Sequence, residues 1–338
     1  MRRPLTLVLV TLSVLALVPG WTGEERLALL GTTARMTATP VALDPTDPAR
    51  RRVGGLDFID GYRLTSPDTA FGGYSALAVR GQEVTLLSDG GNVVRFTLGA
   101  GGRLSGVSFA NLPAGPGTGW DKADRDSESL VVDPATGRSW IGFENYNAIY
   151  RFAPGFARKE RAVRPRAMAR WPSAGGPESL FRLTDGRFVS ISESQRPSRR
   201  LWGPGGGRGQ AREGLIWPGD PVESRTPPVR FAYVTHGSDS VADATVLSDG
   251  RLLVLERGFS PPFRFHNRIV LVSAGAVRPG AIVRGQVLAS LDAPLIHDNF
   301  EGIAVSREGN DTVVWLVSDD NRTPVLQRTL LLRFRLRR

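Results

Sequence analysis

The sequence repeats one cassette of short apolar runs and turns, and this repeat limits the chain to a small set of folds. The cassette is clearest from Asp126 to Phe152, where a carboxylate precedes the run 129–132, a Pro-Gly turn follows, and the run 139–143 ends on Glu144. Runs of about four to eight residues between Gly, Pro and Asp turns are typical of β-strands. Because the 3.6-residue period of helical repeats is absent, the repeat predicts an all-β fold.

The spacing of the cassettes narrows the fold further. Their first strands begin near residues 75, 128, 178, 243 and 301, so the repeat is 50 to 65 residues long. Four short strands per repeat of about 50 residues are the pattern of a β-propeller blade. We therefore predict a β-propeller of five four-stranded blades; six blades would require a hidden blade in the segment before residue 53.

The strand count also predicts how the ring closes. The first cassette has a fourth strand at Ser105–Leu112 and the second at Arg166–Trp171, whereas the fifth cassette has only three strands. A spare apolar run, Gly55–Leu64, precedes the first cassette. If this N-terminal strand pairs with the last strand, the ring closes and the exposed sheet edge disappears.

The N-terminus has the layout of an export signal. A basic head, Met1-Arg2-Arg3, precedes an apolar run from Leu5 to Val18, which is shorter than the roughly 20 residues of a membrane-spanning helix. We expect residues 1–23 to be a signal peptide or, because Val18-Pro19-Gly20 is a poor cleavage site, a retained N-terminal anchor. Residues 24–52 are then a lead-in segment and residues 53–338 the propeller, in a periplasmic or secreted protein with no other membrane span.

Composition excludes several classes of function. The chain has no Cys, so neither a disulfide nor a Cys-ligated metal is available. Its net charge of +10 comes from scattered arginines, which argues against nucleic acid because no basic stripe is interleaved with aromatic residues. Neither a G-x-S-x-G elbow, a P-loop, an H-E-x-x-H motif nor a dinucleotide fingerprint is present. The basic charge is either a solvated arginine-rich surface or a match for an anionic partner such as phosphate. We expect a monomer.

Two rows of polar residues recur at fixed places in the cassettes. The row that enters the first strands is Ser75, Glu128, Glu178, Asp243 and Glu301, and the row that leaves the second strands is Asp89, Glu144, Glu193, Glu256 and Asp319. One hairpin separates the two rows, so both lie on the same face of a propeller, at one mouth of its channel. Crowded carboxylates repel unless cations neutralise them, and Ca²⁺ accepts about 6–8 such oxygen ligands.

These rows supply the candidate site residues. The predicted calcium ligands are Asp89, Glu128, Glu144, Glu178, Glu193, Asp243, Glu256, Glu301 and Asp319. Glu128, Glu178 and Glu301 are the candidate catalytic groups, and Arg125, Arg257, Arg322 and His297 are the candidate substrate-binding groups. The alternative is structural, with each acid accepting hydrogen bonds from backbone N–H groups at strand ends.

The repeated segments resemble a known family. FGGYSALAV with LLSDGG, RDSESLVVDP with WIGFEN, GGPESL with TDGRF, and FEGIAVS with LVSDDN are similar to the phytase-like propeller family named for the "esterase-like activity of phytase". The resemblance covers about residues 53–336 and implies an exported propeller with calcium and phosphate at its channel mouth. It also implies a small anionic substrate such as a phosphate ester. The fourth cassette departs from the pattern, because it begins Asp243-Ala244.

Three functions stay open at this point. The resemblance implies a calcium-dependent phosphoester hydrolase, in which the acids hold the metal and arginines bind the phosphate. The second is a periplasmic propeller without enzymatic activity, which binds a ligand or partner at the same mouth. The third is a metal-dependent carboxylester or lactone hydrolase.

Overall fold

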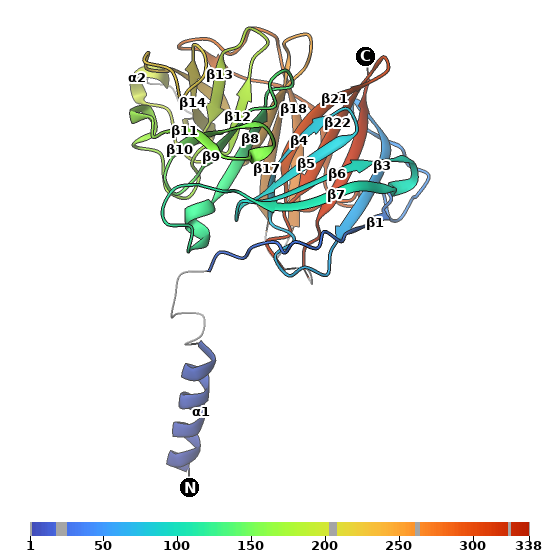
Figure 1. The fold of residues 1–338 in the computed structure, drawn as a ribbon, viewed down its shortest axis with the longest axis vertical. Coiled ribbons are helices and arrows are strands. Elements are labelled where there is room, and N and C mark those ends of the chain that lie inside the picture. Colours follow the sequence, from blue (N-terminus) through green and yellow to red (C-terminus); the bar gives the residue numbers. More distant parts are fainter. Residues whose placement is uncertain (1, 18–25, 203–207, 261–263, 324–325, 338) are drawn as a thin grey trace.

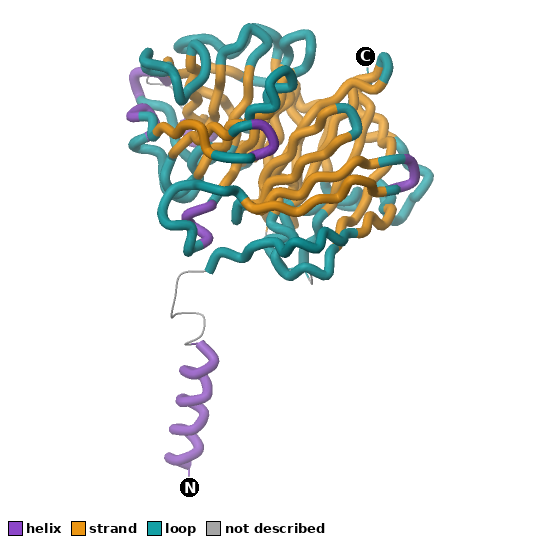
Figure 2. The backbone as a smooth tube through the Cα atoms, viewed as in Figure 1, coloured by secondary structure: helices purple, strands orange, loops and turns teal. Residues whose placement is uncertain are grey.

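The strands of the chain form five antiparallel sheets that together make a ring. The computed structural model describes residues 2–17, 26–202, 208–260, 264–323 and 326–337, and strands dominate this part of the chain (Figures 1 and 2). The innermost strand of each sheet packs beside the innermost strands of two neighbouring sheets. The fold is therefore a five-bladed β-propeller, as the repeat predicts.

The first three blades follow one another along the chain. Blade 1 consists of β4 (Tyr74–Arg80), β5 (Glu83–Ser88), β6 (Asn92–Leu98) and β7 (Leu104–Asn111). Blade 2 consists of β8 (Ser127–Val132), β9 (Ser139–Phe143), β10 (Ala148–Phe152) and β11 (Lys159–Val163). Blade 3 consists of β12 (Ser179–Arg182), β13 (Phe188–Ile191), β14 (Ala211–Trp217), β15 (Val229–Val234) and the short parallel strand β19 (Ile282–Val283).

The last two blades complete the ring. Blade 4 consists of β16 (Ser240–Val246), β17 (Leu252–Ser260), β18 (Arg264–Val272) and β20 (Gln286–Leu291). Blade 5 consists of β21 (Phe300–Glu308), β22 (Asp311–Ser318), β23 (Leu330–Leu336) and the N-terminal strands β3 (Leu56–Thr65), β1 (Thr37–Pro40) and β2 (Arg52–Val53). Because β3 pairs with β23 along its length, the predicted closure by the N-terminal strand is confirmed. The lead-in segment adds β1 outside β3.

The predicted fourth strand of blade 2 at Arg166–Trp171 is wrong. The strand is β11, at Lys159–Val163, and the predicted segment contains a short 3₁₀ turn. Pro165 precedes this turn, and the apolar side chains that suggested a strand, Met168 and Trp171, are buried between blades 2 and 3. They contribute to the core from a loop.

The remaining elements are short helices, apart from one at the N-terminus. They are α1 (Arg2–Leu17), α2 (Arg199–Trp202) and the 3₁₀ turns η2 (Ala100–Gly102), η3 (Lys122–Arg125), η4 (Pro154–Phe156), η5 (Arg166–Met168) and η6 (Arg208–Gln210). None of the described helices is both long and apolar enough to cross a membrane. Residues 18–25, on which the expected cleavage region falls, lie outside the described residues.

The apolar core is divided among the blade interfaces. In the described residues, each of the five apolar clusters lies between two neighbouring blades, for example Leu253 and Ile269 of blade 4 against Leu332 and Phe334 of blade 5. Each sheet is thus apolar on both faces, which is why the strands read as continuous apolar runs. The channel end of each blade is free to carry polar groups.

Candidate functional site at the channel mouth

A β-bulge opens the innermost strand of four blades. The residues skipped in the pairing register are Ser75, Glu128, Ala242 and Glu301. In blade 3, Glu178 directly precedes β12 and has the same place. A bulge adds one unpaired residue and redirects its side chain, so the same local irregularity presents one side chain from each of these four blades to the channel mouth.

The second row follows from one repeated backbone hydrogen bond. The amides of Asp89, Glu144, Glu193 and Asp319 donate to the carbonyls of Gly73, Asp126, Gly176 and Asn299, at 2.8–3.2 Å. Each acceptor lies two residues before the bulge position of its own blade. In blade 4 the corresponding pair is Ser240 with Arg257. Arg257 therefore has the position that an acid holds in the other four blades.

Two predicted ligands of blade 4 are consequently displaced by one residue from the mouth positions. Glu256 is fully buried on the opposite face of β17, where it accepts hydrogen bonds from Tyr233 Oη (2.7 Å) and from the His236 amide (2.9 Å). Asp243 is buried in the channel wall, where it accepts from the Ala244 and Ile303 amides at 2.7 and 2.9 Å. The bulge at Ala242 caused this offset, because a strand without it would point Asp243 to the mouth.

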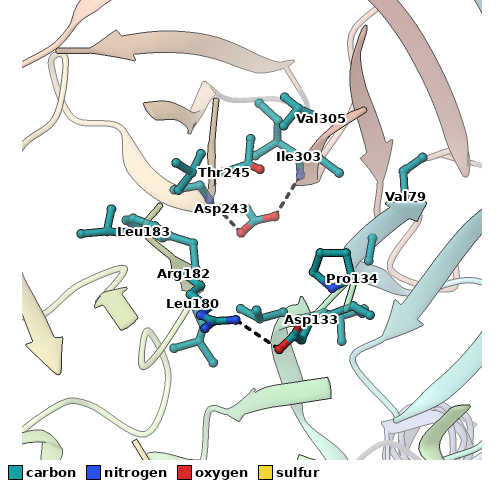
Figure 3. A pocket seen from close by; sticks show the side chains of 18 of the residues that line it. Val79, Asp133, Pro134, Leu180, Arg182, Leu183, Asp243, Thr245, Ile303 and Val305 are labelled. Atoms are coloured by element: carbon teal, nitrogen blue, oxygen red, sulfur yellow. Dashed lines mark hydrogen bonds and ion pairs between the residues drawn. The ribbon is translucent and has the colours of Figure 1, made fainter. Parts of the chain in front are cut away.

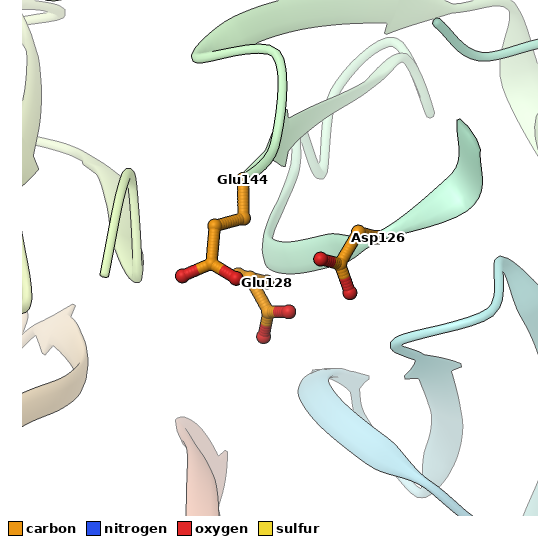
Figure 4. Close-up of side chains that lie close together, drawn as sticks. All are labelled: Asp126, Glu128 and Glu144. Atoms are coloured by element: carbon orange, nitrogen blue, oxygen red, sulfur yellow. The ribbon is translucent and has the colours of Figure 1, made fainter. Parts of the chain in front are cut away.

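The acids of blades 2 and 3 converge into two overlapping groups. Carboxylate oxygens of Asp126, Glu128 and Glu144 lie within 4.8 Å of one another (Figure 4), and so do those of Glu144, Glu178 and Glu193. Glu144 belongs to both groups, and one of its oxygens accepts hydrogen bonds from the Gly175 and Gly176 amides. Asp126 was quoted in the repeat but not predicted as a ligand. The sequence feature that could have identified Asp126 is the spacing Asp126-x-Glu128, because residues two apart in an extended chain point to the same side.

The crowding changes the protonation of these groups. Burial raises the pKa of Glu128 well above its usual range, and the charges of Glu178, Asp126 and Glu144 raise it further. Burial likewise raises the pKa of Glu178, with Glu193 and Glu144 adding to the effect. The pKa of Asp126 is raised to about 7 by burial, although Lys122 opposes the shift. Without a bound metal ion, burial and mutual repulsion thus favour the protonated forms of Asp126, Glu128 and Glu178.

Acids of blades 5 and 1 complete the mouth. Burial raises the pKa of Asp319, and the neighbouring charges of Glu301 and Asp89 add to this shift. Burial also raises the pKa of Glu301, which Arg257 partly offsets. The structure therefore brings seven of the nine predicted ligands to one mouth, and these seven are Asp89, Glu128, Glu144, Glu178, Glu193, Glu301 and Asp319.

Two cations are built into this ring of acids. Arg257 pairs with Glu193 at 2.9 Å and with Glu301, and it donates to Asn299 Oδ1 at 3.0 Å. Lys122 Nζ lies 2.7 Å from Asp89 and 3.9 Å from Asp126. Sequence reasoning missed Lys122. The sequence feature that could have identified Lys122 is its rarity, because this Arg-rich chain has only two lysines and one of them lies in the loop that enters blade 2.

Arg322 is the cation with unused hydrogen-bonding capacity. Its Nε and one terminal nitrogen are buried and have no hydrogen-bond partner among the described residues. The nearest carboxylate oxygen belongs to Asp89, at 3.9 Å. The backbone of Arg322 has a φ of +50°, and its amide donates to Asp320 Oδ1 at 3.0 Å. The loop after β22 thus holds the Arg322 guanidinium beside the mouth, where no carboxylate is hydrogen-bonded to it.

The other two predicted substrate-binding residues bond within their own loops. Arg125 donates to the carbonyls of Pro116 (3.0 Å) and Asp124 (2.8 Å), and so organises the loop that carries Lys122. His297 Nδ1 bonds the Leu295 carbonyl at 2.7 Å. No described contact joins either side chain to the acids of the mouth.

The opposite end of the channel has a different character. A cavity of about 650 Å³ lies there, lined largely by apolar residues such as Val79, Leu180 and Val305 (Figure 3). An ion pair of Arg182 with Asp133, 3.1 Å long, lies at its edge. The buried Asp243 in this wall has both oxygens occupied by backbone amides. The carboxylate cluster is thus confined to one mouth.

Fold and site together define a five-bladed β-propeller whose channel mouth is lined with carboxylates and two paired cations. The chain belongs to the phytase-like family described as "Esterase-like activity of phytase", which matches residues 69–322. This span begins just before blade 1, ends at Arg322, and includes both rows of mouth residues.

Comparison with individual proteins adds distant structural likenesses. No curated protein matches the chain. An α-L-arabinofuranosidase from Podospora anserina is similar in structure, with 13% identity, a TM-score of 0.46, and coverage of 90% of this chain and 98% of that chain. The catalytic domain of an α-L-arabinofuranosidase from Coprinopsis cinerea has 13% identity, a TM-score of 0.47 and the same coverage. Hydrazine synthase from Kuenenia stuttgartiensis has 14% identity and a TM-score of 0.41 and covers 75% of this chain and 79% of that chain.

Proposed function

We propose that this protein is an exported, calcium-dependent hydrolase of small phosphate esters that acts at the carboxylate-lined mouth. The observation that carries the proposal is the pairing of a dense acid cluster with Arg322, a guanidinium whose Nε has no hydrogen-bond partner among the described residues. Guanidinium groups bind phosphate oxygens with paired, charge-assisted hydrogen bonds. Membership of the phytase-like family supports the same substrate class.

The donor set fits calcium. All candidate ligands are carboxylates, and hard oxygen donors are what Ca²⁺ prefers. Oxygens that share one calcium at 2.3–2.6 Å lie within about 5 Å of one another, and the carboxylate oxygens of both groups that share Glu144 meet this condition, because they lie within 4.8 Å of one another. A cation there also relieves the repulsion that raises the pKa of Glu128 and Glu178. Calcium supplies Lewis-acid activation of water and of a phosphoryl oxygen.

The side chains divide the remaining work. Arg322 binds and orients the phosphate, because its Nε and one terminal nitrogen have no hydrogen-bond partner among the described residues and the Asp89 carboxylate, at 3.9 Å, is beyond hydrogen-bond distance. Glu128 and Glu178 are both buried at the mouth. Once the cluster is neutralised by calcium and their protons are released, one of the two carboxylates can accept the proton of the attacking water. Glu301 is held by Arg257 and by Asn299 Nδ2, at 2.8 Å, and therefore positions the neighbouring groups.

The test is hydrolysis of p-nitrophenyl phosphate and phytate by the purified chain, with calcium or with EGTA. We expect turnover with calcium, loss of turnover with EGTA, and at least about a 100-fold loss in Glu128→Gln. Arg322→Gln should raise KM more than it lowers kcat. The matched controls Glu83→Gln and Arg80→Gln change exposed residues at the other end of blade 1 and should behave as the wild type. Absence of turnover with calcium on both substrates would refute the proposal.

The family description also favours a second candidate, a carboxylester hydrolase at the same mouth. p-Nitrophenyl acetate and a lactone therefore belong in the same assay. Turnover of these esters alone, lost with EGTA, would move the substrate class from phosphate to carboxylate. Calcium binding that raises Tm without any turnover would instead indicate a ligand-binding propeller.

A further inference from the structure

The most exposed large apolar side chains of the propeller gather on the mouth face. Among the described residues outside α1, four exceed half exposure, and these are Leu29 (58%), Trp120 (64%), Phe259 (53%) and Leu326 (68%). The next three, Val229, Ile282 and Val287, lie on the outer strands β15, β19 and β20 and are less exposed, at 37–44%. We call these four most exposed side chains the apolar tips. Exposing an apolar side chain to water costs free energy, so four of them at one end of the fold indicate a surface that contacts something other than water.

The topology places all four tips at the mouth end of the blades. Trp120 lies in the loop that enters β8, and Leu326 lies in the loop that carries Arg322. Phe259 is two residues beyond Arg257 on β17, on the same side of the strand, and its ring packs against the Phe265 ring in a tilted arrangement, with the centroids 5.1 Å apart. Leu29 is in the lead-in, whose next residue bonds Asn111 at the mouth end of β7.

Exposed arginines accompany these tips. They are Arg26, Arg196, Arg199, Arg200 and Arg264. Arg196, Arg199 and Arg200 follow the mouth acid Glu193 in the chain. Arg264 begins β18 opposite Ser260, the residue after Phe259. Arg26 lies over the Trp120 ring at 4.3 Å. The acids of the mouth are drawn inward and paired with Lys122 and Arg257. The outward charge between the tips is therefore strongly basic.

We propose that the mouth face docks on the surface of an anionic phospholipid bilayer. The four side chains come from separate segments, namely the loop between blades 1 and 2, the β17–β18 hairpin of blade 4, a loop of blade 5 and the lead-in, whereas a protein interface buries a contiguous apolar core. Separate aromatic and aliphatic tips suit a bilayer interface, into which each inserts alone, while arginines between them contact anionic headgroups. The proposal goes beyond the proposed hydrolysis, because docking does not require turnover.

The test measures partitioning onto vesicles. The full chain carries Leu7→Gln, Val8→Gln, Leu9→Gln, Val10→Gln and Leu12→Gln, so that the exposed apolar residues of α1 do not drive binding. Vesicles of equal phosphatidylglycerol and phosphatidylcholine are compared with pure phosphatidylcholine by co-sedimentation. We expect tighter binding to the anionic vesicles. In this background, Trp120→Ser, Phe259→Ser and Leu326→Ser together should lower the partition coefficient about tenfold or more.

A matched control changes the three apolar residues away from the mouth. Val229→Ser, Ile282→Ser and Val287→Ser together should change partitioning less than about twofold. Arg199→Gln with Arg200→Gln should weaken binding about fivefold per arginine at low salt, and this effect should vanish at high salt. Brominated lipids should quench part of the tryptophan fluorescence, and Trp120→Phe should remove that part.

The outcomes separate docking from catalysis. No binding to anionic vesicles, or an equal loss in the mouth and control variants, would overturn the docking proposal. Turnover of a soluble phosphate ester is measured on the same preparations. Vesicle binding without turnover would keep the docking proposal and refute the proposed hydrolysis, and turnover without vesicle binding would do the reverse.

Discussion

The substitution Asp126→Asn should stabilise the metal-free protein at neutral and alkaline pH. Asp126 lies in the acid group with Glu128 and Glu144, and its pKa is raised to about 7, mainly by burial. Asparagine keeps the shape of the side chain, and its amide oxygen still accepts the hydrogen bond that Asn145 Nδ2 donates to Asp126. The substitution removes the charge and little else.

The size of the effect follows from the pKa. A rise from 3.8 to about 7 is about three pH units, and each unit corresponds to about 1.4 kcal/mol. Ionised Asp126 thus destabilises the metal-free fold by up to about 4 kcal/mol. The folded state keeps its proton to higher pH than the unfolded chain, so stability falls as pH rises from about 4 to about 7 and levels off above that range. The variant should lack this part of the fall.

Urea unfolding followed by tryptophan fluorescence measures the free energy of unfolding, first in EGTA and then with calcium, and the difference gives the stabilisation by calcium. We expect Asp126→Asn to exceed the wild type in EGTA at about pH 8, to equal it near pH 4, and to gain less from calcium. Asp292→Asn, a change of an exposed aspartate in the loop before β21, is the matched control. If the variant is less stable than the wild type at pH 8 without metal, the electrostatic account of the mouth is wrong.

Three further predictions test the strand register of blade 4, the ion pairs of Lys122, and the pairing of β3 with β23 that closes the ring. Glu256→Gln should lower the free energy of unfolding by about 1–3 kcal/mol, because Tyr233 and His236 lose a charged acceptor. The calcium-induced rise in Tm should stay unchanged, and loss of that rise would show that Glu256 binds calcium at the mouth. Lys122→Met should lower the Tm of the metal-free protein, with calcium recovering most of the loss; an unchanged Tm would show that its ion pairs are unimportant. Phe334 is fully buried where β23 pairs with β3, which we call the seam. Phe334→Ala should lower the free energy of unfolding, measured in urea, by about 3–5 kcal/mol. A loss below about 1 kcal/mol would contradict tight closure of the ring.

The sequence repeat was sufficient to predict the blades and the ring closure. Turns such as Asp249-Gly250 and the apolar runs beside them mark the strands directly, because both depend on local chemistry. Gly55–Leu64 was recognised as the closing strand since the fifth cassette lacked a partner for its last strand, and β3 occupies that place. Arg166–Trp171 misled because its apolar residues serve the core from a loop.

The site was less accessible because its geometry depends on the bulges. A bulge leaves no mark in the apolar pattern, and in blade 4 it shifts the mouth positions from Asp243 and Glu256 to Ala242 and Arg257. Arg257 was predicted to bind substrate and Glu256 to bind metal, although the two side chains point to opposite sides of one strand. Lys122 and Asp126 lie in a loop, and only the tertiary fold brings them beside Asp89.

The seam between β3 and β23 sets the order in which the chain can finish folding. A ribosome releases residues 56–65 long before residues 330–336 exist, so the first-made strand must wait for the last-made one. Until then both sheet edges are open to pairing with other chains. A protein translocated unfolded and released whole avoids this interval, whereas one that folds during synthesis does not. Truncation of the final strand should therefore promote aggregation of the entire ring rather than loss of one blade.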